Sequence, residues 1–369
     1  MTTRPPRVVF SDDDHILTLI RTLLETEDRE AALADFLAPD PSDGIDFEEL
    51  TSGLRHSAEL DVLQASSPDA VADMDPTVVI LRRGGVDAAT IEASPRLRLI
   101  QRLGHRVRYL DLDAARRHGV AVSCLPRDSL VSVAEHVVML TLALARRLLE
   151  SDSAVRTGRT RPGQAPGRNG SVYNWAGITG MTSLRGRTMG IVGLGEVGGL
   201  VADRAHALGM RVIHHNRTRG GSDVGSTWHP LEDLLALSDV VTVHVPGSPR
   251  TPVIDARALE AMRPGAFLIN TSRGHLVDED ALYDALVGGQ IAGAALDVHA
   301  DEPRLPDRIT ALENVVLTPH VAAGSRHAVV DEAAAIFANV RAILDDGQPR
   351  HGLVAGAGGT AGQGGSGHD

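Results

Sequence analysis

The run Met189-Gly-Ile-Val-Gly193-Leu-Gly195-Glu-Val-Gly198 decides the fold of this chain. Its β-branched start predicts a strand, and the amphipathic stretch that continues to about Leu208 predicts a helix after the glycines. In such a turn, the first two glycines let backbone amides approach a pyrophosphate, and the third lets the helix pack against the strand. The helix N-terminus then attracts the anion. The residues that we expect at a dinucleotide are Gly193, Gly195, Glu196, Val197 and Gly198.

The end of the next predicted strand, Met210 to His214, indicates which dinucleotide is bound. Dinucleotide-binding folds that prefer NAD usually carry an acid there, which hydrogen-bonds the ribose hydroxyls. This chain instead has Asn216-Arg217-Thr218-Arg219, whose amide and guanidinium groups suit a 2'-phosphate. We therefore expect these four residues to bind the cofactor and NADP(H) to be preferred, with NAD(H) also accepted. The alternative is that the arginines form a solvated turn and that the protein does not discriminate.

Alternating β-branched and amphipathic stretches extend in both directions from this turn. They include Val8 to Phe10 and Val78 to Leu81 upstream, and Val240 to His244 and Ala266 to Asn270 downstream. This alternation predicts an α/β protein with two parallel sheets, a Rossmann dinucleotide-binding domain and a flavodoxin-like domain. The expected boundaries are 1–124 for the first part of the flavodoxin-like domain, 125–321 for the Rossmann domain, 322–348 for a C-terminal helix that returns to the first domain, and 349–369 for a disordered Gly-rich tail.

Composition excludes several classes of function. All 36 basic residues of the 369 are arginines, so lysine Schiff bases, pyridoxal phosphate aldimines and P-loop lysines are excluded. The formal charge of -12 argues against nonspecific nucleic-acid binding. The single cysteine, Cys124, excludes an intramolecular disulfide and the cysteine-based zinc and iron-sulfur sites that need several thiolates. Because no stretch resembles a signal core or a membrane span, we expect a cytoplasmic protein with no membrane, nucleic-acid or metal partner.

The N-terminal run Val8-Val-Phe-Ser-Asp-Asp-Asp14 resembles the start of a phosphoacceptor receiver domain, whose acids hold magnesium. The next candidate strand, however, is followed by Arg82 instead of an acceptor aspartate, and the required lysine is absent. We therefore interpret Asp12 to Asp14 as a strand-end turn and helix cap, and retain only the flavodoxin-like topology.

Three polar motifs follow predicted strands in the C-terminal half. They are Asn270-Thr-Ser-Arg273-Gly, Leu296-Asp-Val-His-Ala-Asp-Glu302-Pro and Leu317-Thr-Pro-His320. Doubly wound sheets bind ligands at the carboxyl ends of their strands. Arginine can fork onto a carboxylate, histidine can exchange a proton near neutral pH, and a neighbouring carboxylate favours the imidazolium. Together these side chains suit the reduction of a 2-oxo acid.

With the glycine turn, these motifs resemble the D-isomer-specific 2-hydroxyacid dehydrogenase family, in particular its glyoxylate and hydroxypyruvate reductases. The runs Ser132-Val-Ala-Glu-His136, Leu184 to Gly193 and His244-Val-Pro246 fall in the same order. The resemblance implies an NAD(P)-dependent oxidoreductase that interconverts a 2-oxo acid and a D-2-hydroxy acid by hydride transfer. In it, Arg273 binds the substrate carboxylate and keto oxygen, His320 is the acid/base, and Glu302 favours the charged form of His320.

The same resemblance implies further contacts and a dimer. The additional cofactor residues are Val245, Pro246, Thr271 and Asp297, the last at the nicotinamide carboxamide. The implied substrate residues of the flavodoxin-like domain are Arg83, Gly84, Gly85 and Gly104. The apolar helix expected at Val131 to Leu149 is a core element or a subunit interface, and in the family it contributes to a homodimer.

Two questions stay open from the sequence. Arg83, Arg106 and Arg108 stand where the family has small or acidic residues, so they either recognise a second anionic group of the substrate or pair with surface acids. The substrate and the direction of the reaction are also undetermined. The alternative function is a nucleotide-sensing, corepressor-like protein on the same fold.

Overall fold

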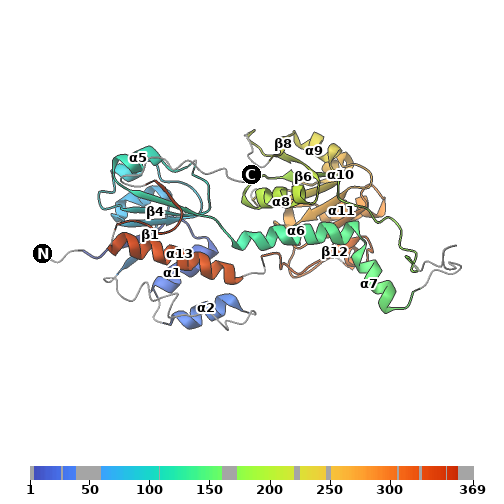
Figure 1. Cartoon of the computed structure of the whole chain (residues 1–369), viewed down its shortest axis with the longest axis horizontal. Helices are drawn as coiled ribbons and strands as arrows, with labels where there is room; N and C mark the ends of the chain where they lie inside the picture. Colours follow the sequence, from blue (N-terminus) through green and yellow to red (C-terminus); the bar gives the residue numbers. More distant parts are fainter. Residues whose placement is uncertain are drawn as a thin grey trace. The chain divides into compact units, whose positions relative to one another are not determined.

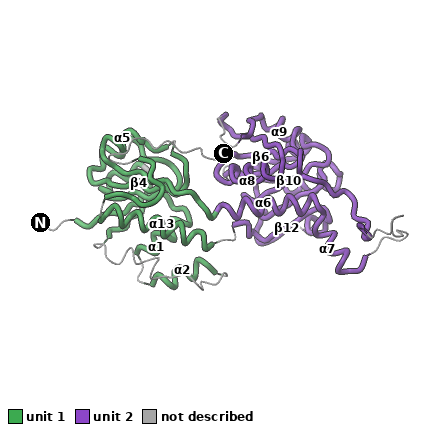
Figure 2. Tube along the Cα trace, in the orientation of Figure 1, with its two compact units in different colours: residues 1–129, 325–369 green, residues 130–324 purple. Residues whose placement is uncertain are grey.

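The computed structural model describes residues 4–25, 28–38, 60–107, 109–159, 173–219, 225–246, 251–305, 307–323, 326–345 and 347–355. The chain divides into two compact units (Figure 2). Unit 1 comprises residues 1–129 and 325–369, and unit 2 comprises residues 130–324. The sequence placed the corresponding boundaries after residues 124 and 321.

Unit 1 is built on a six-stranded sheet (Figure 1). Its strands are β1 (Arg7–Phe10), β2 (Asp61–Gln64), β3 (Val78–Leu81), β4 (Leu99–Leu103), β5 (Ala121–Leu125) and β13 (Leu353–Ala355). The order is β13-β5-β4-β3-β1-β2, and β1 to β5 pair in parallel. The order of the five parallel strands is the flavodoxin-like one, as predicted.

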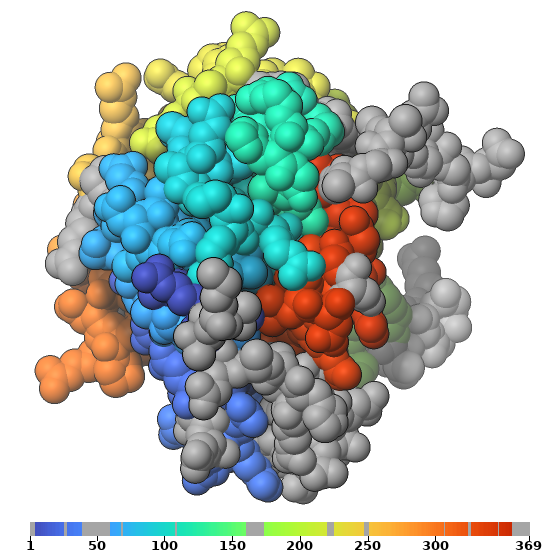
Figure 3. Space-filling view, turned by 90° about the vertical axis from the view of Figure 1, so that its left-hand side faces the viewer, coloured from blue at the N-terminus to red at the C-terminus, as the bar shows by residue number. Residues whose placement is uncertain are grey.

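Helices cover both faces of this sheet because successive strand residues point to opposite sides. The helices are α1 (His15–Glu25), α2 (Arg29–Leu37), α4 (Ala88–Glu92), α5 (Leu112–Arg117) and α13 (Arg326–Asp345), with short 3-10 turns at Pro68–Ala70 and Ala72–Met74. Val8 and Phe10 pack in one cluster with α1, α2 and α13, whereas Val9 packs in the cluster of the other face. Figure 3 shows the red C-terminal segment beside the blue and cyan N-terminal half of this unit.

The prediction of disorder from residue 349 onward is wrong for residues 349–355. Strand β13 pairs antiparallel with β5, and Ala355 is buried. Asn339 on α13 holds the preceding segment, because its side-chain oxygen accepts the amides of Arg350 and His351, each at 2.8 Å. This anchor belongs to a distant helix, so local composition did not reveal it. The rest of the tail, 356–369, lies outside the described residues, as does Arg108.

Unit 2 is built on a seven-stranded parallel sheet. Its strands are β6 (Thr188–Val192), β7 (Arg211–His215), β8 (Thr227–Trp228), β9 (Val240–Val243), β10 (Phe267–Asn270), β11 (Gly293–Leu296) and β12 (Val315–Leu317). The order is β12-β11-β10-β9-β6-β7-β8. Counted from β6, this is the Rossmann order 3-2-1-4-5-6 with one further strand at the β12 edge, which confirms the predicted fold class.

The helices of unit 2 also lie on both faces of its sheet. They are α6 (Ser129–Ala145), α7 (Leu148–Arg156), α8 (Glu196–Ala207), α9 (Leu231–Leu237), α10 (Ala256–Ala261), α11 (Glu279–Val287) and α12 (Asp307–Thr310), with a 3-10 turn at Gly274–Leu276. Residues of α6 and α8 share one core cluster, and residues of α9, α10 and α11 share the other. Because the seven strands are parallel, their carboxyl ends lie at one edge of the sheet, and the predicted polar motifs follow these ends.

The helix predicted over Val131 to Leu149 is two helices. Arg147 adopts a left-handed conformation with φ of 51°, and α7 leaves α6 at an angle of 62°. A left-handed residue cannot continue a right-handed helix, which explains the break. Among the described residues, no single helix has the length and apolar character to span a membrane, and α6 and α7 reach that length only as a bent pair.

Candidate active site

The glycine turn between β6 and α8 has the close approaches that require glycine. Gly193 has φ of 102°, and a Cβ atom there would lie 2.5 Å from the carbonyl oxygen of His244. A Cβ atom on Gly198 would lie 2.5 Å from the Gly193 oxygen. Gly195 is the N-cap of α8 and has no side chain with which to cap this helix. The backbone amides at its start are therefore in place for a pyrophosphate, and the turn fits the predicted dinucleotide.

The turn after β7 is tied to the glycine turn by Asn216. The side-chain oxygen of Asn216 accepts the amide of Leu194 at 2.8 Å. Its backbone oxygen accepts the indole N–H of Trp228 at 3.1 Å, and the guanidinium of Arg219 lies 5.2 Å from the Trp228 ring centroid. The exposed Arg217 and Thr218 complete this turn. Trp228 was not identified from the sequence, although an aromatic residue on a short edge strand beside an arginine turn was a usable signal.

Two further cofactor candidates lie at the same edge of the sheet. Thr271 follows β10 and is buried, and its hydroxyl has no hydrogen-bond partner among the described residues. Such an orphaned hydroxyl suits a polar ligand atom. Val245 and Pro246 follow β9, and Val245 lies against Gly193. The protein surrounds the imidazole of the neighbouring His244 and lowers its pKa to about 4, so this ring is neutral near neutral pH.

Glu302 and His320 form a direct pair. Nδ1 of His320 lies 2.8 Å from a carboxylate oxygen of Glu302, and the other oxygen accepts the His299 amide at 2.9 Å. Burial raises the pKa of Glu302, but the hydrogen bonds from the His320 ring and the His299 amide outweigh it, so the net pKa is below its usual value. Glu302 is therefore ionised at neutral pH and can stabilise an imidazolium.

Arg273 lies on the loop after β10, next to the loop of this pair. Its backbone oxygen accepts the side-chain N–H of Asn270 at 2.9 Å, and its exposed side chain donates to the Ser272 oxygen at 2.6 Å. A Cβ atom on Gly274 would lie within 2.0 Å of the carbonyl of His299. Only glycine permits this approach, which places the Arg273 loop against the residues that precede Glu302.

Asp297 anchors the loop that carries His320. Its side chain is fully buried, and its carboxylate accepts the hydroxyl of Thr318 at 2.6 Å and the amides of Val321 and Ala322, each at 2.9 Å. The sequence had placed Asp297 only at the nicotinamide carboxamide. Its role in holding residues 318–322 was missed, because it depends on the pairing of β11 with β12.

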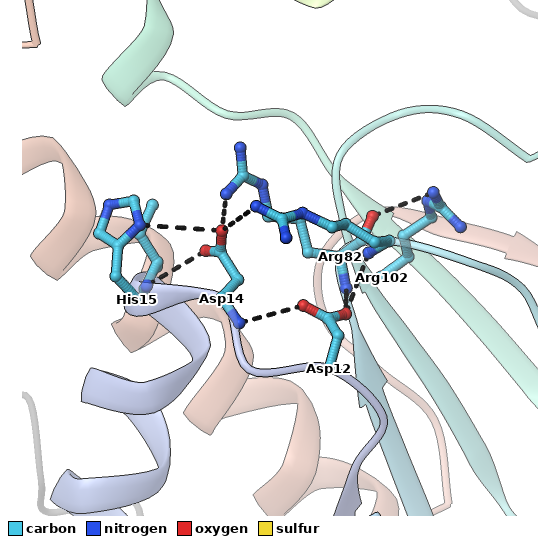
Figure 4. Close-up of polar contacts among 7 residues, drawn as sticks. Asp12, Asp14, His15, Arg82 and Arg102 are labelled. Carbon is cyan, nitrogen blue, oxygen red and sulfur yellow. Dashed lines mark hydrogen bonds and ion pairs between the residues drawn. The ribbon is translucent and has the colours of Figure 1, made fainter. Parts of the chain in front are cut away.

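The substrate loop predicted at residues 82–85 lies in unit 1, where charged side chains hold it (Figure 4). One carboxylate oxygen of Asp12 accepts the amides of Arg82 at 2.8 Å and Arg83 at 3.0 Å. The buried Asp14 pairs with the guanidinium of Arg82 and lies 3.5 Å from that of Arg83. Arg102 donates to the carbonyl oxygens of Arg82 and Gly84, each at 3.0 Å. These side chains fix the backbone conformation of the loop.

The glycines of unit 1 behave as close-approach and turn positions. Gly84 has φ of 66°, and a Cβ atom on Gly85 would lie 1.9 Å from the Tyr109 oxygen. Gly104 has φ of 119° and donates its amide to the Leu125 oxygen at 2.7 Å. Asp14 also accepts the Ile16 amide at the start of α1, which confirms the predicted cap. The sequence did not reveal that the same acids hold the loop after β3.

Comparison with known proteins places these features in context. Residues 138–322 match the model of the D-isomer specific 2-hydroxyacid dehydrogenase NAD binding domain. A D-3-phosphoglycerate dehydrogenase of Archaeoglobus fulgidus is 38% identical over 68% of this chain, and 46% of that protein is covered. A glyoxylate reductase of Thermococcus litoralis is 35% identical over 70% of this chain and 77% of its own length. The chain thus spans about half the length of the D-3-phosphoglycerate dehydrogenases that it matches.

Solved structures show the same similarity. An NADPH-dependent glyoxylate/hydroxypyruvate reductase of Sinorhizobium meliloti, in complex with NADP and malonate, is 27% identical with a TM-score of 0.52. The match covers 95% of this chain and 97% of that one. The similarity therefore extends over both units.

Proposed function

The chain belongs to the D-isomer specific 2-hydroxyacid dehydrogenase family, and we propose that it is an NAD(P)-dependent enzyme that interconverts a 2-oxo acid and a D-2-hydroxy acid. The observation that carries the proposal is the 2.8 Å contact between His320 and the ionised Glu302 at the carboxyl edge of the Rossmann sheet. Arg273, on the adjacent loop, supplies a positive charge for the substrate carboxylate.

The proposed chemistry assigns one task to each of these residues. The nicotinamide cofactor, when bound, supplies or accepts the hydride. Arg273 binds the substrate carboxylate and polarises the keto oxygen. Because Nδ1 of His320 is engaged by Glu302, the proton is held at Nε2 and passes from there to the keto oxygen. Glu302 stabilises the charged ring before this transfer and orients it.

We propose that NADP(H) is preferred over NAD(H). The amides at the start of α8 would hold the pyrophosphate, and Thr271 and Asp297 would lie toward the nicotinamide. Asn216 stands where an acid would repel a 2'-phosphate, and Arg217 and Arg219 add positive charge there. The Trp228 ring beneath Arg219 limits the positions that this guanidinium can adopt.

We propose small 2-oxo acids as substrates, with Arg83, Gly84, Gly85 and Gly104 as their contacts in unit 1. The Arg83 side chain is 66% exposed although it lies near Asp14, and Arg106 is exposed. Both could contact a second anionic group of a larger substrate. Glyoxylate and hydroxypyruvate are the first compounds to test, because one relative named above is a glyoxylate reductase and another is a glyoxylate/hydroxypyruvate reductase.

We also propose a homodimer that forms through α6 and α7. Large apolar side chains are exposed on these helices: Met139, Leu142, Leu148, Leu149 and Val155. Such a patch is typical of an interaction surface. Light scattering of the purified protein should give twice the chain mass of 39.0 kDa, and Leu148→Arg with Leu149→Arg should give the single mass.

A steady-state assay tests the proposed activity. NADPH oxidation is measured with glyoxylate, hydroxypyruvate and larger 2-oxo acids, for the wild type and for His320→Ala. The proposal expects turnover by the wild type alone. Binding of NADPH without turnover of any 2-oxo acid would contradict it and would favour a nucleotide-sensing binding protein on this fold.

A further inference from the structure

His320 lies in a backbone conformation that needs support. Its φ is 56°, in the left-handed region that non-glycine residues rarely adopt. Residues in this region are strained and persist only where surrounding contacts determine them. The contacts that hold the loop 318–322 therefore decide where the imidazole stands.

The first support is Asp297, as described above. Beyond its side-chain contacts, its backbone oxygen accepts the amide of His320 at 2.8 Å. The loop is thus tied to one buried residue at consecutive amides and at the Thr318 hydroxyl. The position of His320 consequently depends on how the Asp297 carboxylate and the Thr318 hydroxyl are oriented.

The second support comes from α6, 182 residues earlier in the chain. Nε2 of His136 lies 3.0 Å from the Thr318 hydroxyl oxygen and 3.5 Å from the carboxylate oxygen of Asp297 that this hydroxyl contacts. The hydroxyl has one proton, and its 2.6 Å contact shows that this proton is donated to the carboxylate. The hydroxyl oxygen must therefore accept, and His136 must donate from Nε2.

This order of donors holds for a neutral ring with its proton on Nε2 and for the charged ring. His136 is largely buried, with 12% of its side chain exposed, so water cannot readily replace its N–H. Thr318 is also held at its backbone oxygen, which accepts from Nε2 of His299 at 3.3 Å. Both oxygens of Thr318 are thus engaged by rings outside the loop.

From this geometry we infer that His136 is a positioning residue for the reaction: through the Thr318 hydroxyl and Asp297, it fixes the loop that presents His320. The inference rests on the proposed function, because it assigns the purpose of the network to the proton transfer by His320. Active-site groups must be held within about 0.5 Å of their working geometry, and small displacements cost large factors in rate.

Two matched pairs of variants test the role. His136→Leu removes the donor, whereas His136→Gln places an amide N–H near the position of Nε2. Thr318→Val removes the hydroxyl, whereas Thr318→Ser keeps it. We expect His136→Leu and Thr318→Val each to lower kcat about tenfold, with KM and the NADPH dissociation constant changed less than twofold.

The conservative variants and the double variant give further readouts. His136→Gln and Thr318→Ser should retain at least about half of kcat, and His136→Leu with Thr318→Val should be no slower than the slower single variant. A normal kcat in His136→Leu, or equal losses in His136→Gln and His136→Leu, would overturn the inference. If His136→Leu does not fold, the Thr318 pair decides by the same criteria.

A measurement without turnover separates this inference from the proposed function. Amide hydrogen exchange of Val321 and Ala322 should be about tenfold faster in His136→Leu than in the wild type, while exchange in β6 stays unchanged. Faster exchange in a protein that reduces no 2-oxo acid would contradict the proposed function but not the network. Unchanged exchange in His136→Leu, together with turnover by the wild type, would contradict the network alone.

Discussion

The loop 318–322 of unit 2 and the loop 82–85 of unit 1 are held by the same device. Each follows a parallel strand, and each is held by an aspartate at the end of the neighbouring strand, Asp297 in unit 2 and Asp12 in unit 1. Each aspartate accepts two consecutive backbone amides. Parallel sheets bring these strand ends together, which explains why the device recurs.

The two loops differ in the charges around the device. In unit 1, Arg82 and Arg102 are engaged in holding the loop, and the buried Asp14 balances Arg82. In unit 2, the buried Asp297 holds its loop through a hydroxyl and backbone amides with support from His136, and the Arg273 side chain and the His320 ring are exposed. The comparison favours our proposal that the reactive charges lie in unit 2, whereas Asp14, Arg82 and Arg102 of unit 1 fix the backbone of the loop 82–85.

The largest expected effect tests the assignment of reactive charge to unit 2. Arg273→Ala and His320→Ala should each lower kcat/KM by at least about a hundredfold, because each removes a group that stabilises or protonates the developing oxyanion. The melting temperature and NADPH affinity should stay near the wild-type values. Near-normal turnover in either variant would contradict the assignment of the reactive charges to unit 2.

Cofactor selectivity is the next largest effect, and it concerns exposed charge in unit 2. The wild type should bind NADPH about tenfold or more tightly than NADH, since one charge-assisted hydrogen bond contributes about 1.5 to 3 kcal/mol. Asn216→Asp with Arg217→Ala should reverse the preference. If titrations show that the wild type binds both cofactors equally, the alternative holds, in which Arg217 and Arg219 form a solvated turn that does not discriminate.

Removing the anchor of unit 1 should act on substrate binding. Asp12→Ala leaves the amides of Arg82 and Arg83 without their acceptor, so KM for the 2-oxo acid should rise about tenfold while kcat falls about twofold or less. The matched control is Asp13→Ala, because Asp13 is exposed and the loop amides are bound by Asp12 instead. A large loss of kcat with unchanged KM would show that the unit 1 loop participates in the chemical step.

The smallest expected effect is a shift in pH dependence from Glu302→Gln. The amide can still hydrogen-bond His320 but cannot stabilise its charge, so the pH at which ketone reduction falls to half should move down by about one pH unit. The pKa of Glu302 is lowered in the folded protein, so its ionised carboxylate stabilises the fold at pH values above the usual pKa of a carboxyl group. This stabilisation is lost as the pH falls and the carboxylate is protonated. The variant should therefore lose less stability than the wild type on acidification.

Much of the architecture was predictable because it depends on patterns between residues that are close in the sequence. The strand, glycine turn and helix from Thr188 to Ala207 were predicted almost to the residue, since periodicity and glycine spacing are local signals. The break at Arg147 was not, because it needs a left-handed residue that the apolar pattern conceals. Strand β13 was missed because Asn339, on another element, holds it.

The residue types of the candidate site could be predicted from the sequence, whereas the contacts that hold its loops could not. Arg273, Glu302 and His320 follow strands, and the common edge of parallel strands predicts that such residues gather. The link from His136 to Thr318 and the clamp of Asp12, Asp14 and Arg102 depend on side chains of separate elements. No spacing along the chain specifies such contacts.

One measurement tests the central claim most directly. The wild type is mixed with a 2-oxo acid that it turns over and with NADPH deuterated at C4 on the transferred face, and the isolated product is examined for isotope and configuration. The account predicts a hydroxy acid of D configuration with deuterium on C2. Product of L configuration, or product without deuterium at C2, would contradict it.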